Sequence, residues 1–196
     1  SRAGKIDLNS SMGELKRGFD FEPRLLPAFY PLAATQDAKT DPQKAEEIFK
    51  KAVAQDQRST EARLALANFY LLSRRMDEAE QQYRAAIDID SKSRDVNLAY
   101  AYFCALNNRA PDAEKIYTSL KNNNPQEPLF GIILADFYAG TGRIDNAIQV
   151  CRQMLAADPK QLVARKRLAN LHLNKREIDD AARIADEILK ENENDD

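Results

Sequence analysis

The chain has 196 residues, of which 43% are hydrophobic and 31% charged, enough apolar side chains for a core and too many for general disorder. The near balance of 29 Lys and Arg with 31 Asp and Glu, a net charge of −2, argues against a nucleic-acid binder. A single histidine excludes a multi-histidine centre, and two cysteines cannot form a disulfide framework. No apolar run approaches the roughly 18 residues of a membrane span, so we expect a soluble, all-helical protein without membrane insertion.

The first 30 residues do not share the helical periodicity of the rest of the chain. Glycines and prolines are frequent here, among them Gly4, Gly13, Pro23 and Pro27. Both residue types interrupt helices. We therefore predict an irregular or partly helical leader over residues 1–30, part of which could be an expression remnant; the alternative for this stretch is a degenerate repeat.

From residue 60 onward the sequence pattern returns every 34 residues, in units 60–93, 94–127, 128–161 and 162–195. Within each unit, two stretches with apolar residues at helical spacing flank a turn signal, as residues 61–72 and 76–89 do in the first. A fainter copy precedes them at residues 26–59. We expect nine helices between about residues 42 and 192, and one repeat array over residues 31–196. Alanine fills the eighth and twentieth positions of the four units: Ala67, Ala101, Ala135, Ala169, and Ala79, Ala113, Ala147, Ala181.

This pattern resembles the tetratricopeptide repeat (TPR) family, whose 34-residue unit is a helix–turn–helix. The resemblance implies an all-α, right-handed superhelical solenoid of antiparallel helix pairs, with about four full repeats plus a degenerate N-terminal one. Each helix has only about three turns and is marginal alone, so stacking on its neighbours has to stabilise it. Two departures are evident. The family's usual glycine at position eight is alanine in every unit, and its early aromatic residue is replaced by Arg63, Asn97, Gly131 and Arg165.

In TPR proteins the first helix of each repeat lines a concave groove, and the resemblance implies such a groove here. Its polar ladder would consist of Asn68, Tyr102, Asp136 and Asn170, one from each unit. Asparagine amides can hydrogen-bond an extended peptide backbone, which suits a peptide channel. The alternative for the apolar members is that they pack helix against helix. The predicted partner-binding residues are Asn68, Leu72, Tyr102, Leu106, Ile133, Asp136, Lys166, Arg167, Asn170 and Asn174.

No group of residues indicates catalysis. His172 falls at the eleventh position of its unit, a packing position in the others, and no nucleophile accompanies it. Cys104 and Cys151 also take packing positions and lack metal-ligand spacing. The segment Gly140–Arg143 lacks the Gly-Lys-Ser/Thr of a phosphate loop and is expected to be a turn. We therefore predict a non-enzymatic protein without a cofactor or a metal.

Three functions fit the sequence. The first is a non-catalytic scaffold or adaptor that binds a peptide or helix of a partner protein in the groove. The alternative is a structural spacer or self-assembly segment of a larger TPR protein, acting through uncapped terminal helices. In the third, apolar side chains of the leader occupy the groove. The unpaired cysteines favour the cytoplasm slightly, and the periplasm would suit a fragment of an exported protein. The leader side chains concerned are Phe19, Phe21, Leu25, Leu26, Phe29 and Tyr30.

Overall fold

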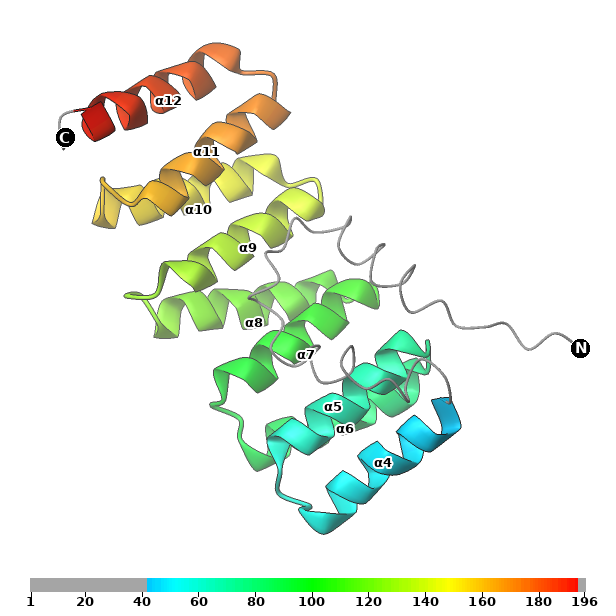
Figure 1. The fold of residues 1–196 in the computed structure, drawn as a ribbon. Helices are drawn as coiled ribbons and strands as arrows, with labels where there is room; N and C mark the ends of the chain where they lie inside the picture. Colours follow the sequence, from blue (N-terminus) through cyan, green and yellow to red (C-terminus); the bar gives the residue numbers. More distant parts are fainter. Residues whose placement is uncertain (1–41, 194–196) are drawn as a thin grey trace, which may run out of the picture. The chain divides into compact units, whose positions relative to one another are not determined.

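A computed structural model describes residues 42–193, with side chains described as far as residue 190. This part of the chain contains nine α-helices and no strand (Figure 1). The expected leader and the start of the fainter repeat lie outside the described residues. None of the described helices is long and apolar enough to cross a bilayer. The helices are α4 (Pro42–Gln55), α5 (Thr60–Leu72), α6 (Met76–Ile89), α7 (Arg94–Leu106), α8 (Ala110–Asn123), α9 (Pro128–Gly140), α10 (Ile144–Ala157), α11 (Leu162–Asn174) and α12 (Ile178–Glu193).

The helices follow the predicted 34-residue spacing. α5, α7, α9 and α11 begin at Thr60, Arg94, Pro128 and Leu162, the first residues of the four units. Each is joined by a tight turn to the second helix of its unit, and the two run antiparallel, as α5 with α6 and α11 with α12 (Figure 1). This confirms the prediction of an all-α repeat of antiparallel helix pairs.

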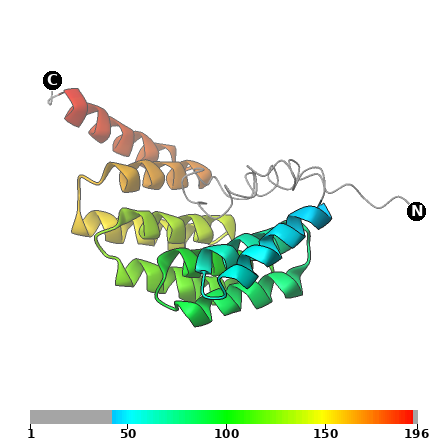
Figure 2. The ribbon, with the colours of Figure 1, turned by 60° about the horizontal axis from the view of Figure 1, so that its bottom comes forward.

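The described helices form two compact units, and the chain passes from the first to the second within α8, between Ile116 and Tyr117. In the first unit, α5 packs against α4 and α6, and α6 packs against α7. In the second unit, α10 packs against α9 and α11, and α11 packs against α12 (Figure 2). α5 and α11 therefore each contact second helices on both sides, which is how short helices gain stability in a repeat array.

The turn between the two helices has the same backbone conformation in each of the four units. The fifteenth residue of each unit has a left-handed backbone conformation: Arg74 (φ 58°), Asn108 (φ 56°), Gly142 (φ 78°) and Arg176 (φ 62°). The next amide then donates to the carbonyl of the eleventh residue, as from Arg75 to Tyr70 at 2.9 Å. This pattern is a Schellman-type helix end, which turns the chain sharply and satisfies carbonyls that the helix leaves open.

Small and aromatic side chains repeat in the core at fixed positions. Ala67, Ala101 and Ala135 are fully buried, which allows neighbouring helices to approach closely. Position 24 of one repeat meets position 10 of the next through aromatic rings, whose centroids in the pairs of α4–α5 and α6–α7 lie 5.8 and 5.2 Å apart. Such offset ring pairs add to the stability gained by burial. The pairs are Phe49–Phe69, Tyr83–Phe103 and Tyr117–Phe137.

Candidate functional site

The clearest open surface that coincides with the predicted groove lies on α11. Val163 and Leu173 are each 49% exposed, and Lys166, Asn170 and Asn174 are exposed as well. Their spacing of three, four, three and one residues places all five on one face of the helix. An exposed face that combines large apolar side chains with a cation and two amides can contact both the side chains and the backbone of a peptide. We call these five residues the α11 face.

An ion pair connects α11 to α9 beside this face. Arg167 Nη2 donates a hydrogen bond to Asp136 Oδ2 at 3.0 Å, and Arg167 Nε lies 2.9 Å from Asp136 Oδ1. Such a two-point contact between guanidinium and carboxylate fixes both side chains. Cys151 is buried nearby, and burial raises the pKa of its thiol to about 12, so it stays protonated and unreactive. Arg167 therefore neutralises Asp136, and Lys166 is left as the net charge of this region.

In the first unit the predicted ladder residues are buried. Asn68 is fully buried, and its side-chain oxygen accepts a hydrogen bond from the Tyr83 hydroxyl. Tyr102 is 5% exposed, and burial raises the pKa of its hydroxyl well above the usual range. Leu72 is buried as well. Both tyrosines are therefore neutral hydrogen-bonding groups at physiological pH.

The ten predicted partner-binding residues thus fall into three groups. Five are buried, Leu106 and Arg167 are half-buried, and Lys166, Asn170 and Asn174 are exposed. The structure brings Asp136 and Arg167 into contact. The assignment of all ten residues to a partner-binding groove stays a prediction. The buried ones are Asn68, Leu72, Tyr102, Ile133 and Asp136.

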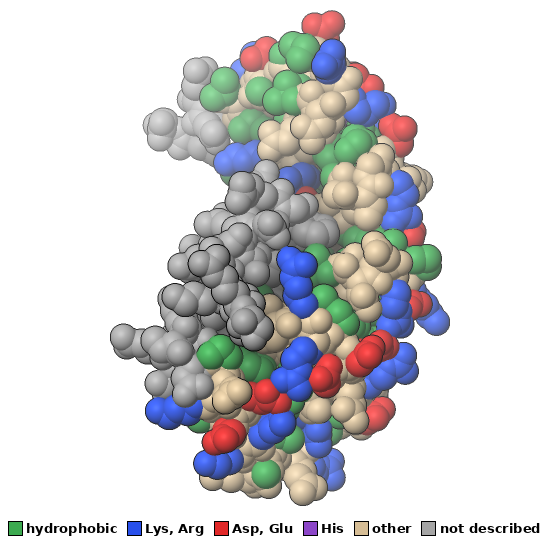
Figure 3. All heavy atoms as spheres, turned by 90° about the vertical axis from the view of Figure 1, so that its right-hand side faces the viewer, with side chains coloured by type: hydrophobic (Ala, Val, Ile, Leu, Met, Phe, Trp, Pro, Cys, Tyr) green, Lys and Arg blue, Asp and Glu red, His purple; other side chains and the backbone are tan. Residues whose placement is uncertain are grey.

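Two further features of the described residues are the distribution of surface charge and the surroundings of His172. On the described part of the face in Figure 3, Lys and Arg side chains are interspersed with Asp and Glu side chains. His172 is buried, and its Nδ1 lies 2.6 Å from Glu177 Oε2. His172, Glu177 and Asp180 are the described residues whose ligand atoms lie close enough together to suggest a metal ion. In the sequence these residues form the pattern His-x4-Glu-x2-Asp, which by itself does not predict a ligand set.

Comparison with known protein families agrees with the repeat pattern of the helices. A family model described as tetratricopeptide repeat matches residues 38–86, 75–136 and 138–196. No curated protein sequence matches the chain significantly.

Solved structures resemble the chain at low sequence identity. The Pseudomonas aeruginosa protein pilF is 19% identical, with 93% of this chain and 73% of that chain covered and a TM-score of 0.57. MamA from Desulfovibrio magneticus RS-1 is 13% identical, with 100% and 99% covered and a TM-score of 0.57. YrrB, described as a TPR protein with an unusual peptide-binding site, is 14% identical, with 94% and 91% covered and a TM-score of 0.53. At these identities the similarity shows a shared fold.

Proposed function

Because the chain belongs to the tetratricopeptide repeat family, we propose that it is a non-catalytic protein-interaction scaffold or adaptor. It binds a peptide or helix of a partner protein along the first helices of its repeats. The family's repeats generally serve as non-catalytic scaffolds, and YrrB, which has a similar fold, is described as having a peptide-binding site. The α11 face is the observation that carries the proposal.

The α11 face supports partner binding because two of its large apolar side chains are exposed to solvent. The side chains of Val163 and Leu173 are half exposed, one near each end of the helix. Lys166, Asn170 and Asn174 lie between or beside them and can orient a ligand through hydrogen bonds. Burying such apolar side chains in an interface, with polar groups at its edge, is the usual source of protein–protein affinity.

A double substitution on this face tests the proposal. The Val163→Ser, Leu173→Ser variant removes the apolar contacts and leaves the buried core of α11 intact. We expect it to weaken binding of the native partner at least about tenfold, since central apolar contacts each contribute on the order of 1 kcal/mol or more. The measurement is quantitative affinity capture from cells of the source organism, followed by a binding titration with the partner that is identified.

The matched control is Leu189→Ser on α12, which also removes an exposed leucine, one that is 60% exposed. Circular dichroism should give the same helix content for both variants and the wild type. Partner binding that survives the α11 substitutions, or that is lost equally in the α12 control, would contradict a binding role for the α11 face.

A second candidate function is a spacer or self-assembly segment, and one feature of α12 favours it. Ile178 and Leu189 are 59% and 60% exposed, and Ala182 and Ala185 are exposed between them. These four residues recur every three or four positions, as the contact residues of paired helices do. We call them the α12 outer stripe. A second protein surface could cover this stripe.

A further inference from the structure

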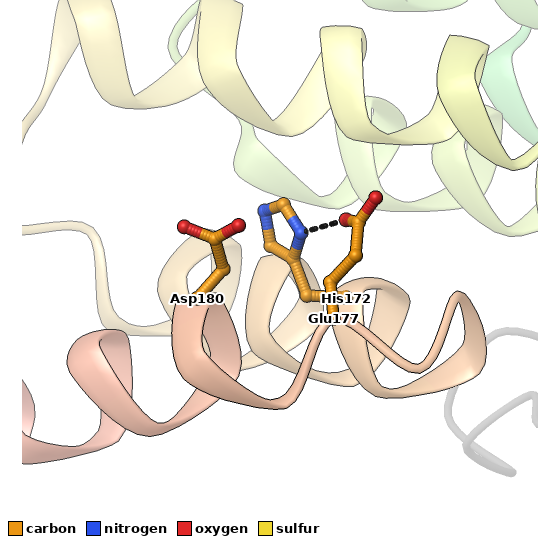
Figure 4. Close-up of side chains that lie close together, drawn as sticks. All are labelled: His172, Glu177 and Asp180. Atoms are coloured by element: carbon orange, nitrogen blue, oxygen red, sulfur yellow. Dashed lines mark hydrogen bonds and ion pairs between the residues drawn. The ribbon is translucent and has the colours of Figure 1, made fainter.

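The turn between α11 and α12 brings an imidazole and two carboxylates together. The potential ligand atoms of His172, Glu177 and Asp180 all lie within 4.8 Å of one another. Figure 4 shows the Glu177 and Asp180 carboxylates on opposite sides of the His172 ring. The ring is fixed in place, because the His172 side chain is only 4% exposed. The cluster is built on a rigid turn, in which the Glu177 amide donates to the His172 carbonyl at 2.9 Å.

Glu177 determines which ring nitrogen of His172 carries the proton. His172 Nδ1 lies 2.6 Å from Glu177 Oε2, and because an ionised carboxylate can only accept, Nδ1 must donate. Glu177 is itself held by Lys175, whose Nζ lies 2.9 Å from Glu177 Oε1. In the neutral ring the lone pair is therefore on Nε2. Within the described part of the chain Nε2 has no hydrogen-bond partner, and Figure 4 places it on the side of Asp180.

This arrangement resembles that of a metal-binding histidine, in which one ring nitrogen binds the ion and the other donates a hydrogen bond. In proteins, a metal-binding histidine usually donates its other N–H to a carboxylate, which orients the ring and raises its basicity. Here Glu177 is that carboxylate, and in the neutral ring the opposite nitrogen carries the lone pair and lies on the side of a second carboxylate (Figure 4).

The earlier repeats show what is missing at this position. Arg75 pairs with Glu78 at 2.9 Å, and Arg109 pairs with Asp112 at 2.6 Å, both between the sixteenth and nineteenth positions of their units. In the last unit the arginine is replaced by Glu177, while the acid is kept as Asp180. The arginine that pairs with the acid at position 19 in two other repeats is therefore absent from the last unit. Asp180 instead has an exposed ion pair with Arg183, at 3.2 Å.

We propose that His172 Nε2 and the Asp180 carboxylate bind a divalent transition-metal ion of the zinc class, with Glu177 as the positioning residue behind His172. Water or a partner's group completes the coordination. The mixed nitrogen and oxygen donors favour zinc, cobalt or nickel over calcium or magnesium, which prefer oxygen donors alone. In the neutral ring the proton is on Nδ1, so Nε2 can bind the ion while the hydrogen bond to Glu177 is kept.

The chain contains one histidine, so every imidazole signal in a nuclear magnetic resonance spectrum comes from His172. The test uses the full chain without a histidine tag, labelled with ¹⁵N, and long-range proton–nitrogen correlation at neutral pH. Without metal we expect the pattern of a ring protonated on Nδ1. Titration with zinc chloride should shift the Nε2 resonance in a saturable way. A ring protonated on Nε2, or imidazole signals that do not move in millimolar zinc, would overturn the proposal.

Variants separate the proposed ligand from its neighbours. Asp180→Asn should weaken zinc binding at least about tenfold, and Glu177→Gln about 10- to 100-fold, since partners that orient a ligand contribute that much. The matched control is Asp179→Asn, an exposed acid one residue away, which should bind zinc as the wild type does. If the control loses as much affinity as Asp180→Asn, the effect is general negative charge and the proposed site is wrong. Helix content measured by circular dichroism verifies the fold of each variant.

Discussion

Individual side chains of the predicted ladder carry different chemistry at the same repeat position. The ninth residue is Asn68 in one unit, bonded to Tyr83 in the same unit, and Asp136 in another, paired with Arg167 of the following unit. Sequence periodicity places these residues on first helices. It does not show which partner each one reaches, since those partners lie 15 and 31 residues away and the choice depends on side-chain length. The exposure of the α11 face likewise became evident only from the packed structure.

Glu46 is a partly buried carboxylate whose pKa is strongly lowered in the folded chain. Burial acts to raise its pKa, but hydrogen bonds from Lys50 (2.7 Å), Arg75 (2.6 Å) and Tyr70 (3.1 Å) outweigh burial and lower it to about 2. The pKa is thus lower in the folded than in the unfolded chain, so the bonds to ionised Glu46 stabilise the fold above about pH 4.5. That stabilisation disappears as the pH falls toward 2.

We expect Glu46→Gln to lower the free energy of unfolding by about 1 kcal/mol at pH 7, because Arg75 and Lys50 lose their contacts with a partly buried carboxylate. At pH 2.5 most of that difference should be gone, since Glu46 is then protonated in the unfolded chain and its ionisation on folding offsets most of the gain from the ion pairs. Urea unfolding at the two pH values measures both quantities. Glu47→Gln, at an exposed neighbouring position, is the control and should change stability little at either pH. A penalty for Glu46→Gln that is independent of pH would contradict the ion-pair explanation.

At the scale of helices, periodicity predicted most of the structure. The expected helices 61–72 and 76–89 agree with α5 and α6 within one residue, and the turn signal Asn107-Asn108-Arg109 lies between α7 and α8. The left-handed residue in each turn was less evident, because only Gly142 of the four is a glycine. Tertiary packing and the bond from position 16 to position 11 hold arginine and asparagine in this conformation at the other turns.

These turns allow a paired prediction about stability. Arg74→Gly should raise the free energy of unfolding by up to about 1 kcal/mol, because glycine adopts the left-handed conformation without a Cβ penalty. Gly142→Ala should lower it by about 1 kcal/mol through strain alone, since an added Cβ meets no atom within 4 Å. Thermal or urea unfolding measures both changes. Arg74→Ala keeps the strain and serves as the control, expected within a few tenths of a kcal/mol of the wild type. Equal effects of glycine and alanine at position 74 would refute the argument.

At the scale of the whole molecule, exposed apolar surface is unevenly distributed between the two units. Large apolar side chains that are exposed in residues 42–190 belong to the second unit, with Ile48 as the exception. Repeat periodicity could not predict this, because α5 and α11 occupy equivalent positions in their units. Nevertheless, Leu71 at position 12 of its unit is 5% exposed, and Leu173 at the same position of the last unit is 49% exposed. The second unit therefore carries both surfaces proposed for association, the α11 face and the α12 outer stripe.

The two candidate functions make opposite predictions for the α12 outer stripe. A stable dimer usually buries about 800 Å² on each partner, and one face of a single helix with two large apolar side chains supplies less than that. We therefore expect the wild type to be monomeric at micromolar concentration in sedimentation velocity, and the Ile178→Glu, Leu189→Glu variant to have the same mass and to bind its partner as tightly. The variant leaves Ile184 in place, because that side chain is buried and a charge there would disrupt the fold. A wild-type mass that rises with concentration, and falls to the monomer value in the variant, would instead support self-assembly through α12.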